Sequence, residues 1–199
     1  MRIIIDGTVG VGKTTVLVGS SQRDKLKRKF TSIKDFGFPV FSDLVIDVIR
    51  EMRAQGMQDP SQNWNYFFNL ATQHAITYYK SADVHTVNFY DRGIFFLEIM
   101  AKRYGCDMPQ NYYDFCQHNR YDAPVFIFSP IWDIDMTKPH KTDNRGKIYT
   151  DSERKLQQQQ IIDLYKKYGY EIVEVPLGSN NIYESVDYRL KKIKEVLGL

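Results

Sequence analysis

The sequence has little cysteine and no long apolar run. Its 199 residues include only Cys106 and Cys116, whose spacing fits neither a redox CxxC pair nor a zinc site. No stretch of about 18 apolar residues is present, which argues against a membrane span. An acid follows the short apolar run at the N-terminus, unlike a secretory signal. These absences predict a reduced protein of the cytoplasm.

Charge of one sign is not in excess either. Lys and Arg number 27 and Asp and Glu 24, a formal net charge of +3. This value is too small to indicate nucleic acid binding, so we expect neither a nucleic acid nor a membrane partner. Because no linker or repeat divides the chain, residues 1–199 are expected to form a single domain. The oligomeric state stays open, with a homodimer as one option.

Apolar, strand-like runs alternate with amphipathic helical patterns along the chain. The expected strands cover residues 2–6, 39–42, 86–90, 124–128 and 171–175. Helices are expected from residue 13 onward and at about 44–54, 59–80, 93–104, 109–117, 150–168 and 182–197. This alternation predicts an α/β fold with three layers, α/β/α, around a five-stranded parallel sheet. In such sheets ligands bind beyond the carboxyl ends of the strands.

A glycine-rich motif follows the first expected strand. Residues 7–14 read GTVGVGKT and match the G-x-x-x-x-G-K-[ST] pattern of the P-loop. Its glycines let backbone amides wrap a phosphate, and the next helix points its positive end there. Lys13 is expected to reach the β- and γ-phosphates of ATP, and Thr14 to ligate Mg²⁺. The predicted nucleotide-binding residues are Gly7, Thr8, Val9, Gly10, Val11, Gly12, Lys13, Thr14 and Thr15.

Two further expected strands end in acidic residues. The third ends in Asp91-Arg92-Gly93. Asp91 can hold Mg²⁺ through water or accept a hydroxyl proton, and Arg92 can clamp a phosphate. The alternative is a helix N-cap aspartate beside a surface arginine. Asp43, after the second strand, is either a second carboxylate near the same pocket or the N-cap of the following helix.

Two other segments offer ligand contacts. A mobile basic lid is predicted at about 136–154, with Arg145 as the residue that reaches the transferring phosphoryl group; a solvated loop is the alternative. Other basic candidates there are Lys138, Lys141 and Arg154. In the expected helix 59–80, Phe68 and Gln73 are candidates to stack on and hydrogen-bond a base, although core packing suits most of its aromatic residues.

These motifs together resemble the P-loop kinases of nucleosides and nucleoside monophosphates, which share the loop, a strand ending in Asp-Arg or Glu-Arg, and a basic lid. Within that group the chain is most similar to the NadR-like AAA-domain family of predicted ATPases and kinases, whose best-known member phosphorylates ribosylnicotinamide. The matching residues are Asp43, Ile49-Arg50-Glu51, Gln73, Tyr121-Asp122, Asp143-Asn144-Arg145, Leu164-Tyr165, Gly169-Tyr170 and Val173-Glu174-Val175-Pro176. The family usually has Glu where Asp43 stands, and residues 19–34 have no counterpart that we can align.

The resemblance implies an ATP-dependent kinase that transfers the γ-phosphoryl group to a nucleoside, a nucleotide or a related small molecule. The predicted catalytic residues are Lys13, Asp43, Asp91, Arg92 and Arg145. Asp43, Phe68, Gln73 and Arg92 are predicted to bind the substrate, and Thr14 and Asp91 the Mg²⁺ ion. Either Asp43 or Asp91 would deprotonate the acceptor. The alternative function is an NTP-binding ATPase or switch that acts through a protein partner, although no guanine-reading N-K-x-D motif is present.

Overall fold

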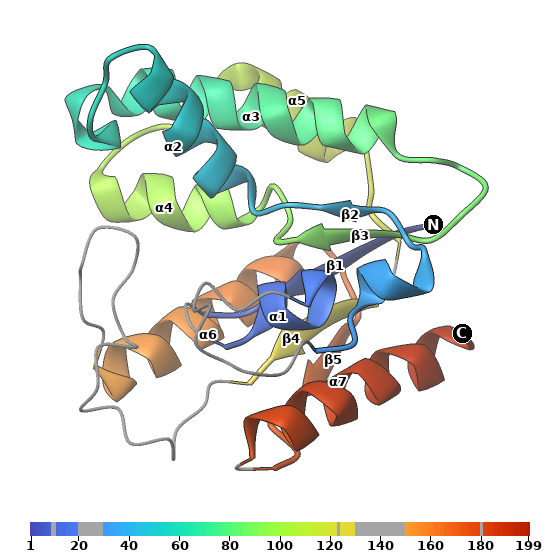
Figure 1. The fold of residues 1–199 in the computed structure, drawn as a ribbon. Helices are drawn as coiled ribbons and strands as arrows, with labels where there is room; N and C mark the ends of the chain where they lie inside the picture. The colour runs from blue at the N-terminus through green and yellow to red at the C-terminus, as the bar shows by residue number, and fades with distance from the viewer. Residues whose placement is uncertain (9–10, 20–29, 123, 130–149, 180) are drawn as a thin grey trace.

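The computed structural model describes residues 1–8, 11–19, 30–122, 124–129, 150–179 and 181–199 (Figure 1). Five strands form its sheet: β1 (Arg2–Asp6), β2 (Val40–Phe41), β3 (Asn88–Asp91), β4 (Val125–Phe128) and β5 (Ile172–Val175). The helices are α1 (Lys13–Val18), α2 (Leu44–Ala54), α3 (Trp64–Ser81), α4 (Phe96–Tyr104), α5 (Gln110–His118), α6 (Asp151–Lys167) and α7 (Ile182–Leu197), with the 3-10 turns η1 (Ile33–Phe36) and η2 (Pro60–Gln62).

All neighbouring strands are parallel, in the order β2-β3-β1-β4-β5. The pairing of Ile5 with Asp91 brings the carboxyl ends of β1 and β3 to the same level. The α/β fold with a five-stranded parallel sheet is therefore confirmed. The chain segments that follow β2, β3 and β1 leave the sheet side by side, and they contain the predicted P-loop, Asp43 and Arg92, while Asp91 ends β3.

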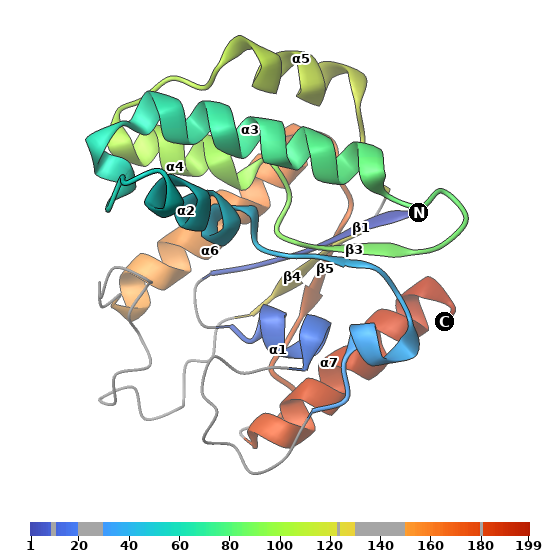
Figure 2. The same ribbon diagram turned by 45° about the horizontal axis from the view of Figure 1, so that its top comes forward.

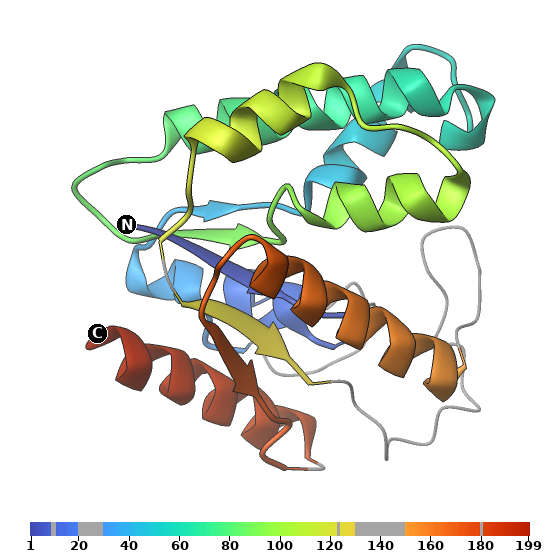
Figure 3. The ribbon, with the colours of Figure 1, turned by 180° about the vertical axis from the view of Figure 1, so that it is seen from behind.

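Helices cover both faces of the sheet (Figures 1 and 2). Side chains alternate between the faces of a strand, so Ile3 and Ile5 of β1 pack with α1 and α7, whereas Ile4 packs into the larger core beneath α2–α6. The view from behind shows α6 and α7 separated by β5 (Figure 3). This arrangement is the three-layer α/β/α sandwich that the sequence predicted.

Most element boundaries agree with the sequence patterns, and α2 and α7 begin and end at the predicted residues. The prediction of one continuous helix at 59–80 is wrong, because the structure divides this segment into η2 and α3. Asn63 has φ −159°, which breaks the helix, and its side chain caps α3 by accepting the amide of Tyr66 at 3.0 Å. The helix expected at 93–104 begins only at Phe96.

The predicted capping box at the start of α6 is present. The Thr150 hydroxyl accepts the amide of Glu153 at 3.2 Å, and the Glu153 carboxylate accepts the amide of Thr150 at 2.8 Å. Most of the expected lid, at 136–154, lies outside the described residues. Cys106 and Cys116 are free thiols. Within the described ranges, no helix is both long and apolar enough to cross a membrane.

Candidate functional site

The P-loop joins β1 to α1, and its described part needs glycine at two positions. A Cβ atom on Gly7 would lie 2.7 Å from the carbonyl oxygen of Phe128, so a larger residue would push β4 away. Gly12 has φ +84°, a left-handed conformation that glycine adopts without cost, and it precedes α1. Val9 and Gly10, also predicted to bind nucleotide, lie outside the described residues. Thr15 lies in the first turn of α1 and accepts the amide of Gly19 at 2.9 Å.

The side chain of Lys13 is buried and folds back onto the P-loop. Its Nζ atom donates to the carbonyl oxygens of Gly7 and Thr8, both at 3.2 Å, and the residue is only 6% exposed. Burial, together with the nearby charge of Arg92, lowers the pKa of Lys13 to about 8. The Nζ hydrogen bonds are thus made to neutral carbonyls, while the nearby carboxylates of Asp91, Asp6 and Asp43 favour the charged form of the ammonium.

Thr14 and Asp91 connect the P-loop helix to β3. The Thr14 hydroxyl donates to Asp91 Oδ2 at 2.6 Å, while the buried Oδ1 atom has no hydrogen-bond partner among the described residues. Burial raises the pKa of Asp91 above its ordinary value. Because Asp91 is a strand residue and Phe95 caps α4, its N-cap explanation is wrong. A carboxylate oxygen without a partner beside a threonine hydroxyl suits a hydrated Mg²⁺ ion.

A cation at this place would depend on the ligand for most of its coordination. The described residues contain no group of three or more His, Cys, Asp or Glu side chains that could hold a metal ion by themselves. Mg²⁺ usually keeps several waters and binds through one or two protein groups plus phosphate oxygens. Thr14 and Asp91 therefore fit a magnesium site of the nucleotide-dependent kind.

Arg92 is buried in the site, not on the surface. Its Nε atom donates to Asp43 Oδ2 at 2.9 Å, and its Nη1 atom lies 3.7 Å from Asp6 Oδ1. The guanidinium also stacks over the ring of Phe96 at 4.1 Å. Burial opposes its charge, but the carboxylates of Asp43, Asp6 and Asp91 together raise the pKa of Arg92. The structure thus excludes the surface-arginine alternative.

Arg92 also has an unusual backbone conformation. Its φ of +78° makes it the only non-glycine residue with positive φ in the described part of the chain. Its amide donates to the carbonyl of Ile5 at 3.0 Å, which extends the pairing of β3 with β1 by one residue. A left-handed conformation is costly for arginine and is typical of functional positions.

Asp43 fulfils both roles that the sequence left open. Its Oδ1 atom accepts the amide of Val45 at 3.1 Å and caps α2, and its Oδ2 atom accepts the hydrogen bond from Arg92. One carboxylate therefore ties the start of α2 to the end of β3. Asp43, Asp91 and Arg92 are brought together, as predicted, with Lys13 and Thr14.

Asp6 and Tyr165 are site residues that sequence reasoning missed. Asp6 is fully buried at the end of β1, where it accepts the amide of Gly7 at 2.7 Å and the Tyr165 hydroxyl at 2.8 Å. Burial raises the pKa of Asp6. Its position directly before the P-loop was a usable signal. Tyr165 lies on α6, 159 positions away, and only its packing reveals the contact.

Among the described residues, the structure packs Phe68 into the core and leaves Gln73 exposed on α3. Phe68 is fully buried in the larger core, stacked with Trp64 at 5.9 Å, and its contact with a base stays a prediction. Arg154 is buried in the first turn of α6. Lys138, Lys141 and Arg145 lie outside the described residues.

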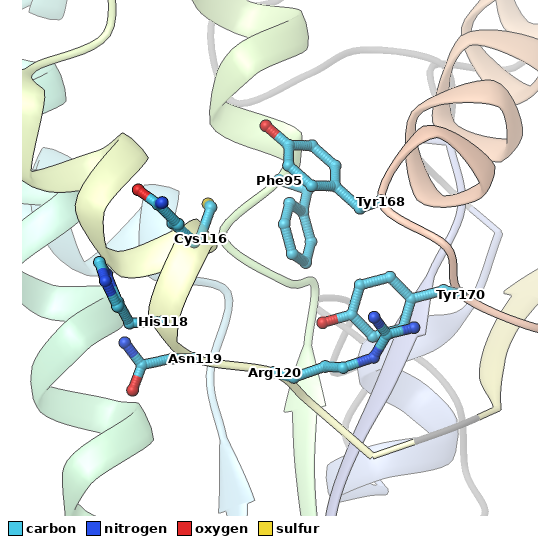
Figure 4. A pocket seen from close by; sticks show the side chains of 8 residues that line it. Phe95, Cys116, His118, Asn119, Arg120, Tyr168 and Tyr170 are labelled. Atoms are coloured by element: carbon cyan, nitrogen blue, oxygen red, sulfur yellow. The ribbon is translucent and has the colours of Figure 1, made fainter.

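A separate pocket lies near the amino ends of β4 and β5, where Arg120 and Tyr170 precede those strands (Figure 4). It is lined by Phe95, Cys116, Gln117, His118, Asn119, Arg120, Tyr168 and Tyr170. The P-loop and Asp91 lie at the carboxyl ends of β1 and β3. The pocket is therefore not part of the candidate site.

Comparison with known proteins supports the interpretation of the fold. Residues 2–182 match the model of a family described as an AAA domain. A search of the curated proteins found no match. Among solved structures, the chain is similar to deoxyadenosine kinase from M. mycoides with bound dATP, at 16% identity and a TM-score of 0.56 over 100% of both chains.

Two further structures are similar over 100% of this chain and 99% of the other. One is the same M. mycoides enzyme with the products dCMP and a flexible dCDP, at 15% identity and a TM-score of 0.54. The other is shikimate kinase from Bacteroides thetaiotaomicron, at 13% identity and a TM-score of 0.54. At these identities the likeness shows the P-loop kinase-like fold. A P-loop domain of this kind implies nucleotide binding.

Proposed function

This chain belongs to the AAA-domain family, and on that premise we propose that it is an ATP-dependent phosphotransferase of the nucleoside and nucleotide kinase type. The observation that carries the proposal is the convergence of polar residues beyond three adjacent strands. Asp6 ends β1, Asp91 ends β3 and Asp43 follows β2, all near the P-loop lysine.

The P-loop amides and Lys13 would hold the phosphates of ATP. Thr14 and Asp91 would hold Mg²⁺, which neutralises charge on the phosphate oxygens. Arg92 would orient the acceptor and face the phosphoryl group through its buried Nη1 atom, which donates to no acceptor among the described residues and lies 3.7 Å from Asp6 Oδ1. Catalysis of this kind depends mainly on positioning and electrostatics.

The proposed step is a direct transfer. The acceptor oxygen forms a bond to the γ-phosphorus while the bond from that phosphorus to the bridging oxygen breaks, and ADP leaves with the bond electrons. The acceptor proton passes to a carboxylate. Asp91 has a raised pKa, which favours it as the proton acceptor, whereas Asp43 is held in place by Arg92. Both remain candidates for this role.

The charges around Arg92 favour a neutral acceptor. Its guanidinium already faces the carboxylates of Asp43 and Asp6, so it has little net charge to offer to an acceptor phosphate. We therefore place a hydroxyl acceptor, such as a nucleoside, ahead of a monophosphate. Because the sequence resembles the NadR-like kinases, we include ribosylnicotinamide among the candidate hydroxyl acceptors.

The test is ATP consumption in the presence of Mg²⁺ across a panel of acceptors. The panel contains nucleosides, ribosylnicotinamide, nucleoside monophosphates, shikimate and a sample without acceptor, and Lys13→Ala is the control. We expect a stimulation of turnover by one hydroxyl-bearing class that Lys13→Ala abolishes. Stimulation by monophosphates alone would overturn the acceptor assignment. Slow turnover that needs Lys13 but no acceptor would overturn the kinase and favour the partner-dependent switch.

A further inference from the structure

A second buried arginine, Arg189, contacts the P-loop from α7. Arg189 lies in the middle of α7 and is 2% exposed. Its guanidinium donates to three backbone carbonyl oxygens: to Val11, to Ser129 at 2.9 Å and to Pro176 at 3.2 Å. These carbonyls belong to the segments that follow β1, β4 and β5. One side chain thus connects the P-loop with the segments that follow β4 and β5.

The packing of α7 explains how this side chain reaches so far. Val186, Leu190 and Ile193 of α7 share a core with Val11 and Val16, which places the helix against the P-loop and α1. The Arg189 guanidinium then lies over the ring of Phe128, 4.6 Å from its centroid.

The segment after β5 is pressed against the same helix. A Cβ atom on Gly178 would lie 2.4 Å from the ring of Tyr188, so only glycine permits this approach. The approach brings the carbonyl of Pro176 within reach of Arg189 Nε. The three contacts of Arg189 are therefore built into the packing of α7 and do not arise from a chance conformation of an exposed side chain.

Within the described ranges, Arg189 forms no ion pair with a carboxylate. All of its hydrogen-bond acceptors in the described structure are neutral carbonyls, and burial alone lowers its pKa to about 10. The buried Arg92, by contrast, faces two carboxylates. An unpaired buried charge is costly to a fold, so an anion that binds nearby would relieve that cost.

The contact with Val11 also bears on the shape of the loop. In a trans peptide the N–H points away from the C=O. Because Arg189 holds the carbonyl of Val11 toward α7, the amide of Gly12 is turned away from α7. Backbone amides turned in this way are the groups with which a P-loop binds phosphate.

We propose that Arg189 is a positioning residue of the nucleotide site, which fixes the P-loop through the Val11 carbonyl and supplies a buried positive charge that the phosphate chain balances. The proposal rests on the nucleotide-binding part of the proposed function and does not depend on the acceptor. It assigns to α7 a role in phosphate affinity that no P-loop motif contains.

The test compares Arg189→Gln and Arg189→Lys with the matched control Lys191→Gln. Lys191 lies on the same helix with its side chain 77% exposed, so the control variant removes one positive charge at a solvent-exposed position. Dissociation constants for Mg-ATP and for tripolyphosphate are measured by calorimetry on protein shown to be folded by circular dichroism. We expect Arg189→Gln to weaken both ligands about tenfold or more, and Lys191→Gln to change them less than twofold.

Arg189→Lys separates charge from geometry. It keeps the charge but cannot bond three carbonyls with a planar fork, so we expect a loss of about three- to tenfold, smaller than that of Arg189→Gln. Wild-type affinity in folded Arg189→Gln, even with a lower melting temperature, would overturn the proposal and leave a purely structural role. If Arg189→Gln does not fold, wild-type affinity in Arg189→Lys would overturn the positioning role. A wild-type chain that binds neither ligand would instead refute the proposed function.

Discussion

Thr14 and Asp91 are joined by a hydrogen bond of 2.6 Å although 77 positions separate them in the chain. The bond connects the first turn of α1 with the last residue of β3, and it forms because β3 pairs with β1. It leaves one oxygen of the Asp91 carboxylate buried and without a hydrogen bond from any described residue. The two polar motifs of the sequence meet at this point, where a cation and a phosphate chain would bind.

Asp91→Asn tests the role of this carboxylate through two measurements, the Mg²⁺-dependent ATP affinity and the melting temperature. The amide keeps the shape of the side chain but removes the charge, so we expect the Mg²⁺-dependent part of ATP affinity to be lost and any turnover to fall about 100-fold. Because burial raises the pKa of Asp91, its charged form costs stability, and the melting temperature should be unchanged or higher. Equal ATP affinity with and without Mg²⁺ in the wild type would contradict the magnesium assignment.

The conformation of Arg92 predicts a difference between two variants that both lose its ion pairs. Arg92→Ala retains a Cβ atom at φ +78°, whereas Arg92→Gly does not. A left-handed conformation costs a non-glycine residue about 1–2 kcal/mol. We expect Arg92→Gly to be more stable than Arg92→Ala by about 1 kcal/mol in urea unfolding, with both unable to transfer phosphate. An alanine variant at least as stable as the glycine variant would show that the conformation carries no strain.

The lowered pKa of Lys13 predicts that nucleotide binding weakens in alkaline solution. The free protein loses the Lys13 charge as the pH rises through about 8, whereas the bound phosphates favour the charged form. ATP affinity should therefore fall about tenfold between pH 7 and 9, with proton uptake on binding near pH 8.5. Calorimetry in buffers of different ionisation enthalpy measures the uptake. In Lys13→Met this proton uptake should disappear, and its persistence would assign the titration to another group.

Gly93 is tightly enclosed between the sheet and α6. A Cβ atom there would lie 2.6 Å from Ile4 Cδ1 and 2.8 Å from the Tyr165 hydroxyl, which Asp6 holds. We expect Gly93→Ala to lower the free energy of unfolding by about 1–3 kcal/mol. Ile4→Val removes the nearer atom, so the double variant should lose less stability than the sum of the two single changes. Strict additivity would show that Ile4 does not cause the conflict.

The sequence alone determined the fold class, most of the helices and strands, and the P-loop motif. The apolar periods of residues 44–54 and 182–197 are local, so they predicted both helices with their boundaries. Because parallel strands present their carboxyl ends at one edge, residues that follow separate strands could be placed together. Asp43 and Asp91 were placed beside the P-loop lysine in this way, without any knowledge of their contacts.

Only the tertiary structure decided which distant side chains complete the site. Tyr165 reaches Asp6 because α6 packs across the sheet, and Arg189 reaches Val11 because α7 packs against α1. Tyr165 belongs to a matching Leu164-Tyr165 pair, but no local pattern indicates the contact that either Tyr165 or Arg189 makes. Phe68 shows the converse. An aromatic residue on an amphipathic helix can pack in a core or contact a ligand, and the tertiary structure buries Phe68 in the core. Contacts between elements depend on how whole faces pack, and that information is not contained in any single stretch of sequence.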